Sequence, residues 1–154
     1  MKKVLVAYFS LTGNTEKMAE YIAEGVRFSG NKAIVQKVSE LKKAGDLEGY
    51  DGYIFGSPTS SLDLPKPMKT FLSLVQKANL ESKIGGAFGS YSHDISYKHD
   101  TYAPAIIFNI LQKENKMKPF ELGPFNLKED NVETREGMRA CQDYGRVFGE
   151  KLGV

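Results

Sequence analysis

The residues of this chain whose types and spacing best suit chemistry are the six at positions 10–15. They are Ser10, Leu11, Thr12, Gly13, Asn14 and Thr15. They supply three hydroxyls, one carboxamide and one glycine, and no lysine or arginine. Glycine lets the backbone adopt a positive φ, so that successive N–H groups can point at one spot. If a helix begins here, its free N–H groups and positive dipole end face that spot too, which suits a phosphate monoester.

The same residue types have a plainer interpretation, because Ser, Thr, Asn and Gly are ordinary helix-capping residues. The sequence of this loop excludes two better-known phosphate-binding motifs. A Gly-Lys-Ser/Thr end is missing, which excludes a Walker A loop, and so is the dinucleotide pattern Gly-x-Gly-x-x-Gly. The ligands that remain for a binding loop are a mononucleotide or a small phosphate.

Five short segments have the composition of strands. The first is an almost continuous apolar run, typical of a strand buried on both faces of a parallel sheet, and the second is more mixed, as in an edge strand. The fifth is bracketed by Pro119 and Pro124. The expected strands are 3–9, 33–38, 51–57, 84–90 and 119–123.

Helical patterns fall between or after these segments, with apolar residues three and four positions apart. They cover residues 18–26, 67–75, 106–111 and 138–152. Strands that alternate with helices predict βαβ units and a three-layer α/β sandwich around a doubly wound parallel sheet. In such sheets ligands bind beyond the carboxyl ends of the strands. The loops at 10–15, 57–66 and 90–100 are therefore expected to meet.

The segment Val6–Thr15 resembles the FMN-phosphate loop of flavodoxins, Ser/Thr-x-Thr-Gly-x-Thr after the first strand. Phe55–Thr59 and Gly86–Tyr91 resemble the loops that follow strands 3 and 4 in flavodoxins and in the flavodoxin modules of flavodiiron proteins. Cys141–Arg146 also matches a recurrent family pattern. The resemblance implies a short-chain flavodoxin, one domain over residues 1–154, and five parallel strands in the order 2-1-3-4-5.

The family binds the FMN ring between the second and third loops. Carried over by position, one side of the ring is lined by Pro58, Thr59, Ser60, Ser61 and Leu62. The other side is lined by Gly89, Ser90, Tyr91, Ser92, His93 and Asp94. The resemblance thus assigns these residues, together with residues 10–15, to FMN.

Two loop features depart from the family. The chain has no tryptophan, and His93 stands where short-chain members carry the tryptophan that covers the ring. Tyr91 or Tyr97 is the alternative stacking residue, and His93 and His99 are otherwise plain loop residues whose spacing suggests no metal site. The segment from Ser60 to Asp63 lacks the glycine that family members use for a peptide flip at the flavin, which bears on one-electron chemistry.

Charge is the third departure, because flavodoxins are typically strongly acidic. Here 21 Lys and Arg stand against 19 Asp and Glu, a net charge of +2. Lys66, Lys69 and Lys98 lie in or beside the flavin loops, and positive surroundings would make the second reduction potential less negative. Alternatively these lysines face solvent and are screened within about 10 Å. The balance argues against nucleic acid or a membrane surface as a partner.

The resemblance implies a monomeric, non-covalent FMN protein that passes single electrons between a reductase and an acceptor protein. One alternative is an FMN-dependent NAD(P)H or quinone reductase on the same fold, and another is a flavin-free binding module. No catalytic triad, paired carboxylates or metal cluster is recognisable. The single Cys141 permits no internal disulfide and favours a reducing, cytoplasmic location. No apolar run is long enough to span a bilayer.

Overall fold

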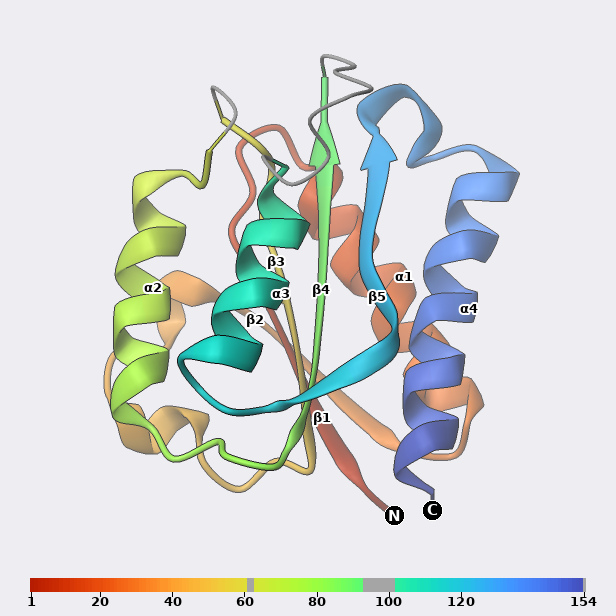
Figure 1. Cartoon of the computed structure of the whole chain (residues 1–154). Helices are drawn as coiled ribbons and strands as arrows, with labels where there is room; N and C mark the ends of the chain where they lie inside the picture. Colours follow the sequence, from red (N-terminus) through yellow and green to blue (C-terminus); the bar gives the residue numbers. More distant parts are fainter. Residues whose placement is uncertain (61–62, 93–101, 154) are drawn as a thin grey trace.

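The computed structural model describes residues 1–60, 63–92 and 102–153. A parallel five-stranded sheet lies between two layers of helices (Figure 1). The strands are β1 (Lys3–Tyr8), β2 (Lys32–Lys37), β3 (Gly52–Gly56), β4 (Ile84–Tyr91) and β5 (Lys118–Lys128). Their order is β2-β1-β3-β4-β5, which confirms the predicted doubly wound α/β fold.

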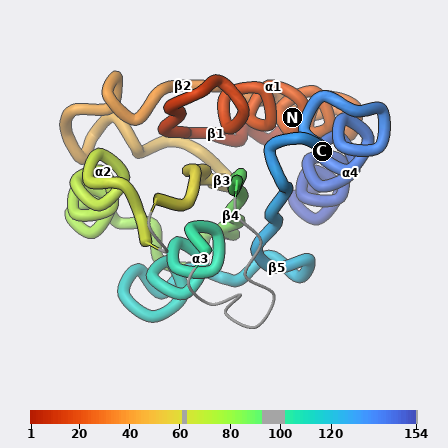
Figure 2. Tube along the Cα trace, turned by 90° about the horizontal axis from the view of Figure 1, so that it is seen from above, coloured from red at the N-terminus to blue at the C-terminus, as the bar shows by residue number. Residues whose placement is uncertain are grey.

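Helices cover both faces of the sheet. They are α1 (Asn14–Phe28), α2 (Lys66–Lys77), α3 (Ala103–Lys113) and α4 (Arg135–Leu152), with short 3₁₀ turns η1 (Val38–Glu40), η2 (Ala44–Leu47) and η4 (Glu129–Asn131). Viewed from above, α1 and α4 lie on one face, and α2 and α3 on the other (Figure 2). Central strand β1 is buried from Val4 to Tyr8, as its apolar run predicts.

Helices α1 and α4 pack with their backbones in contact. A Cβ added at Gly25 would lie 1.9 Å from the carbonyl oxygen of Gln142, and one added at Gly145 would lie 1.9 Å from that of Ile22. The crossing therefore has no room for a side chain at either glycine. Because α1 begins at the 10–15 loop, this contact anchors the helix that carries the candidate phosphate site.

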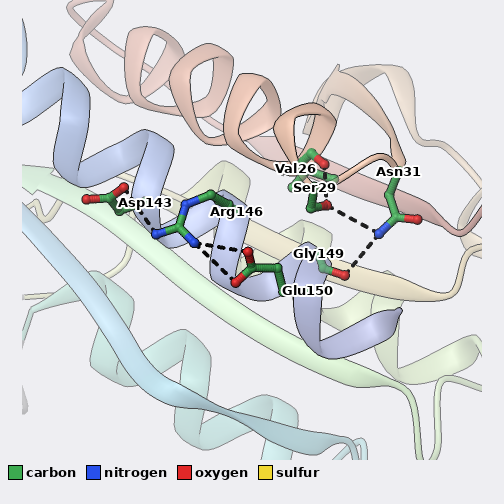
Figure 3. A network of polar contacts seen from close by, with 7 residues as sticks. All are labelled: Val26, Ser29, Asn31, Asp143, Arg146, Gly149 and Glu150. Carbon is green, nitrogen blue, oxygen red and sulfur yellow. Dashed lines mark hydrogen bonds and ion pairs between the residues drawn. The ribbon is translucent and has the colours of Figure 1, made fainter. Parts of the chain in front are cut away.

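A buried asparagine ties the far end of this helix pair together (Figure 3). The Asn31 carboxamide nitrogen donates to the carbonyl oxygens of Gly149 (2.9 Å) and Gly153 (2.8 Å), and its oxygen accepts from the Lys2 amide (2.9 Å). On α4, Arg146 pairs with Glu150 at 3.0 Å. That pair is exposed, so it adds little stability compared with the Asn31 contacts.

The fifth strand is longer than its sequence predicts. Pro119 and Pro124 do not bracket it but lie within it, because an edge strand can present proline on its unpaired side. The register shifts between Gly85 and Ala87, and Gly123 adopts a φ of 72°. The Tyr144 hydroxyl bridges this irregularity: it lies 2.7 Å from the Gly123 carbonyl oxygen and accepts from the Ala87 amide at 3.2 Å.

Candidate functional site

The loop between β1 and α1 has the conformation that its glycine predicts. Gly13 adopts a φ of 93° and directly precedes Asn14, the first residue of α1. A Cβ at Gly13 would meet no atom within 4 Å, so the space over the loop is open. Leu11 and Thr12 are exposed beside it. The loop therefore presents its backbone to a ligand approaching from the carboxyl edge of the sheet.

Hydroxyl groups hold the loop in shape. The Ser10 hydroxyl oxygen accepts from the Gly13 amide at 3.1 Å, and that of Thr12 accepts from the Asn14 carboxamide at 3.0 Å. No side chain in the described ranges caps the start of α1. The amides of its first turn, at residues 14–16, have no partner within the helix. They are the donors available to an anion, and residues 10–15 include no cation.

Thr15 lies deeper than the rest of this loop. Its hydroxyl is 2.8 Å from the hydroxyl of Ser90 on β4, and both residues are only 1% exposed. Two residues that the sequence assigns to different FMN loops thus touch through their side chains. The Thr15 hydroxyl serves this internal contact, whereas the Thr15 amide lies in the first helical turn.

The loop after β3 continues along β4. The Ser57 amide donates to the Phe88 carbonyl oxygen at 3.2 Å, and the Thr59 amide donates to that of Ser90 at 3.0 Å. A Cβ at Gly89 would lie 2.3 Å from the Ser57 carbonyl oxygen, so glycine is required for this close approach. The predicted meeting of the second and third loops is found on these described residues.

The tip of the second loop closes without a glycine. Ser60 and Asp63 form two backbone hydrogen bonds of 2.9 Å, and Ser61 and Leu62 between them lie outside the described residues. The Lys69 ammonium group donates to the Asp63 carboxylate at 2.7 Å. This hydrogen bond, followed by one from the Leu64 amide, lowers the pKa of Asp63. The positive charge of Lys69 is thereby balanced locally.

The third loop is described as far as residue 92. Gly89 and Ser90 are buried, Tyr91 is half-buried and Ser92 is exposed. The Tyr91 ring centroid lies 4.8 Å from that of Tyr102, which precedes α3. Further sequence predictions, on His93, Asp94, Tyr97, Lys98 and His99, lie outside the described residues.

The sequence predictions do not include three residues that also lie at the site, Tyr102, Ala103 and Asn126. Tyr102 supports Tyr91, and the hydroxyl of Thr59 accepts from the Ala103 amide at 2.9 Å, which fixes the start of α3 beside the site. Asn126 pairs with Gly89 across β4 and β5, and its buried side-chain oxygen has no hydrogen-bond partner among the described residues. An aromatic residue before the Ala-Pro start of a helix was the available signal for Tyr102. No sequence signal marks Asn126.

Two titratable groups near or below the site are held in their neutral form. The Tyr8 hydroxyl donates to the Glu16 carboxylate at 2.9 Å, and burial, then Glu16, raises the pKa of Tyr8 to about 12. Burial also raises the pKa of the Cys141 thiol to about 12. The Cys141 side chain is fully buried in the core.

The described residues fit FMN in two respects. An open, cation-free turn offers main-chain donors to a phosphate, and two touching loops end beside it with a supported tyrosine ring. The described ranges contain no cluster of three His, Cys, Asp or Glu side chains that could hold a metal ion. Among those ranges, too, no helix has the length and apolar character needed to cross a bilayer.

Comparisons with known proteins agree with this geometry. Residues 6–134 match the family model described as flavodoxin. A flavodoxin of Clostridium saccharobutylicum is 35% identical over 97% of this chain and 94% of its own length. An NAD(P)H dehydrogenase (quinone) of Acidithiobacillus ferrooxidans is 36% identical, but over only 58% of this chain and 57% of that protein.

Solved structures give the same result. The structure of an archaeal flavodoxin superposes with a TM-score of 0.84 at 27% identity, and covers 99% of both chains. The flavodiiron core of Flv1 from Synechocystis shares the fold, with a TM-score of 0.81 at 24% identity over 98% of this chain and 36% of that one. The family model covers residues 6–134, and the relative and the structure cover nearly the whole chain, which belongs to the flavodoxin family.

Proposed function

We propose that the protein binds FMN non-covalently and carries single electrons between redox protein partners. The observation that carries the proposal is the loop from Ser10 to Thr15, where a left-handed Gly13 leads into a helix whose first amides lack a side-chain cap. Each hydrogen bond to a charged phosphate oxygen contributes about 1.5–3 kcal/mol, so three backbone donors hold the anion without a lysine or arginine.

In this arrangement the bound FMN supplies the redox chemistry, and the protein positions it and adjusts its surroundings. The amides at residues 14–16 hold the phosphate, and the hydroxyls of Ser10 and Thr12 keep the loop in its receptive shape. The loops at 57–60 and 89–92 border the ring, with Tyr91 as the stacking candidate among the described residues because Tyr102 supports its ring.

The first test is a comparison of FMN with riboflavin. Apoprotein titrated calorimetrically is expected to bind FMN at least about 1,000-fold more tightly, since the two ligands differ only in the phosphate. Gly13→Ala should weaken FMN more than riboflavin, because alanine is strained at a φ of 93° and the loop must change. Gly45→Ala, where an added Cβ meets nothing within 4 Å, is the matched control. Equal affinity for the two ligands would refute the proposal.

A second candidate function, FMN-dependent reduction of quinones by NAD(P)H, is favoured by the partial similarity to quinone dehydrogenases. The two functions differ in turnover. An electron carrier oxidises NADPH slowly with or without a quinone, and a stepwise reductive titration separates its two one-electron potentials. Rapid quinone-dependent NADPH oxidation would favour the reductase. Protein that retains no flavin colour after incubation with FMN and removal of the unbound FMN would favour a flavin-free binding module.

A reductase and an acceptor protein as redox partners, a monomeric state and a cytoplasmic location belong to the same proposal. The buried, unpaired Cys141 supports a reducing compartment. Sedimentation with and without FMN tests the monomer.

A further inference from the structure

A concave site lies beside the phosphate loop, on the face of the sheet that α2 covers. It is a cavity of about 1040 Å³ between α2 and the segment that follows β2, two elements that run next to each other in Figure 2. This volume is just above the usual range for small-molecule pockets, which ends at about 1,000 Å³. The cavity is open enough for a ligand to enter from solvent, since Ser39, Lys42 and Ser73 on its walls are exposed.

The cavity is distinct from the proposed ring site. It shares Ser10, Leu11 and Gly13 with the phosphate loop, but no residue of the 57–60 or 89–92 segments lines it. Its other walls come from residues 37–42 and from α2. A molecule in this cavity would therefore contact the phosphate loop at Ser10, Leu11 and Gly13 and leave the two ring-binding loops uncovered.

The rim of the cavity is strongly positive. Lys37, Lys42, Lys66 and Lys77 line it, and Glu16 is the lining residue with a negative charge. Glu16 is already engaged, because it accepts the hydrogen bond of the Tyr8 hydroxyl. All four lysines are exposed, and none forms an ion pair with a carboxylate of residues 1–60, 63–92 or 102–153.

The floor is apolar. Val38, Leu41 and Phe71 are buried at its base, and Phe9 and Leu74 are half-buried over them. A floor of this kind gains from covering an apolar body, at about 25 cal/mol per Å² of apolar surface removed from water. A small inorganic anion would leave that floor wet, and an uncharged hydrocarbon would leave the four ammonium groups unpaired. The two features together select a molecule that has both parts.

We propose that this cavity binds a small organic anion with an apolar body, such as an aromatic or aliphatic carboxylate, sulfonate or phosphate ester. The apolar body lies on Phe71 and Leu74, and the anionic group faces Lys42 and Lys77. The cavity does not include the ring-binding loops, and binding in it does not require FMN. Because Leu11 and Gly13 line the cavity and also belong to the phosphate loop, a bound molecule is expected to change the environment of that loop.

The test uses naphthalene-1-sulfonate and its uncharged analogue naphthalene-1-sulfonamide as probes. Each is titrated into isotope-labelled full-length protein that has been loaded with FMN and freed of unbound FMN, and binding is followed by two-dimensional amide NMR. The expected result is saturable shifts at residues 38–42 and 70–77, with the sulfonate bound more tightly than the sulfonamide. Added salt should weaken the sulfonate selectively, because it screens exposed charges.

Matched variants identify the charges involved. Lys42→Gln with Lys77→Gln should weaken the sulfonate roughly 2- to 30-fold, the effect of two exposed charge pairs, and leave the sulfonamide unchanged. Lys32→Gln with Arg139→Gln removes two exposed positive charges, one at the start of β2 and one on α4, which covers the other face of the sheet, and should change neither probe. Amide spectra of both double variants check that they fold.

Three outcomes would overturn the proposal. One is the absence of saturable binding, and another is equal affinity for the two probes. The third is a set of shifts confined to residues 10–15 that FMN abolishes, which would place the sulfonate in the phosphate loop. The titration is repeated without FMN, so a failure of FMN to bind is seen separately and leaves the result for the cavity intact.

Discussion

The hydroxyls of Thr15 and Ser90 meet 2.8 Å apart in the interior, although 75 positions separate the two residues in the chain. Thr15 belongs to the first turn of α1, and Ser90 to the last part of β4. The contact joins the element that would hold a phosphate to the element that would border a ring. Both residues are almost fully buried, so each hydroxyl depends on the other for a hydrogen bond.

Thr15→Val is therefore expected to destabilise the fold by about 1–3 kcal/mol, because it leaves the Ser90 hydroxyl buried without its partner. The double change Thr15→Val with Ser90→Ala removes both hydroxyls and should cost less than the sum of the single changes. Urea unfolding of the four proteins measures the coupling energy. Strict additivity would show that the hydroxyl pair contributes nothing.

Gly145→Ala is expected to reduce stability by more than about 2 kcal/mol, because its methyl group would lie 1.9 Å from the Ile22 carbonyl oxygen and force α1 and α4 apart. Gly45→Ala is the control, since its added Cβ meets nothing within 4 Å. Thermal unfolding compares the two variants with the parent protein. A similar midpoint for both variants would contradict a backbone-to-backbone helix crossing.

Stability should fall in alkaline solution. Burial raises the pKa of Cys141 from 9.0 to about 12 and that of Tyr53 from 10.0 to about 12. Both groups stay neutral in the folded protein while the unfolded chain ionises, so their contribution is complete below about pH 9 and is lost as the pH rises above it. Ionisation of Cys141 in the unfolded chain lowers the free energy of unfolding by about 1.4 kcal/mol at pH 10. Urea midpoints measured across this range check the decline.

Cys141→Ala separates the thiol from the tyrosines. The variant should be less stable near neutral pH, because it leaves a small cavity, but its stability should fall less steeply just above pH 9. The parent thiol should also react with a disulfide reagent only after unfolding. Rapid labelling of the native protein would contradict the buried position of Cys141.

Lys66→Glu should make the second reduction potential of FMN-loaded protein more negative, since Lys66 begins α2 beside the flavin loops and pairs with no carboxylate in the described part of the chain. Lys69→Glu adds the same charge at a position where Asp63 already balances the lysine, and Lys118→Glu adds it at the far end of the sheet. Spectroelectrochemical titration of the three variants checks the order. Equal shifts of the second reduction potential in all three variants would contradict a local effect of Lys66, because screening by salt would then outweigh the position of the charge.

Much of the fold could be predicted from local patterns. The apolar run of β1, the spacing of Met18, Ile22 and Val26, and the positive φ of Gly13 follow from residue types close together in sequence. The length of β5 could not be predicted, because Pro124 is tolerated only when its strand lies at the edge of the sheet. That position is a property of the whole topology and not of the segment.

The candidate site divides in the same way. Residues 10–15 could be predicted from their composition. The positions of the second and third loops follow from the rule that ligands bind at the carboxyl ends of parallel strands. The support of Tyr91 by Tyr102 and the engagement of Lys69 by Asp63 could not be predicted, because each pair is brought together only when a loop folds back on itself. Charge counted along the sequence therefore overstated the positive field near the ring loops.

Asn31 has a consequence for how the chain can be reconnected. One carboxamide holds the backbone at Lys2 and at Gly153, so these distant stretches of sequence remain immediate neighbours. A linker of a few glycine and serine residues would join these two stretches. New termini could be placed at the exposed Gly45 in η2. Such a circular permutant should keep the sheet, both helical layers and the phosphate turn. The same permutant with Asn31→Ala would lose the hydrogen bonds that hold Lys2 and Gly153 together and should be less stable.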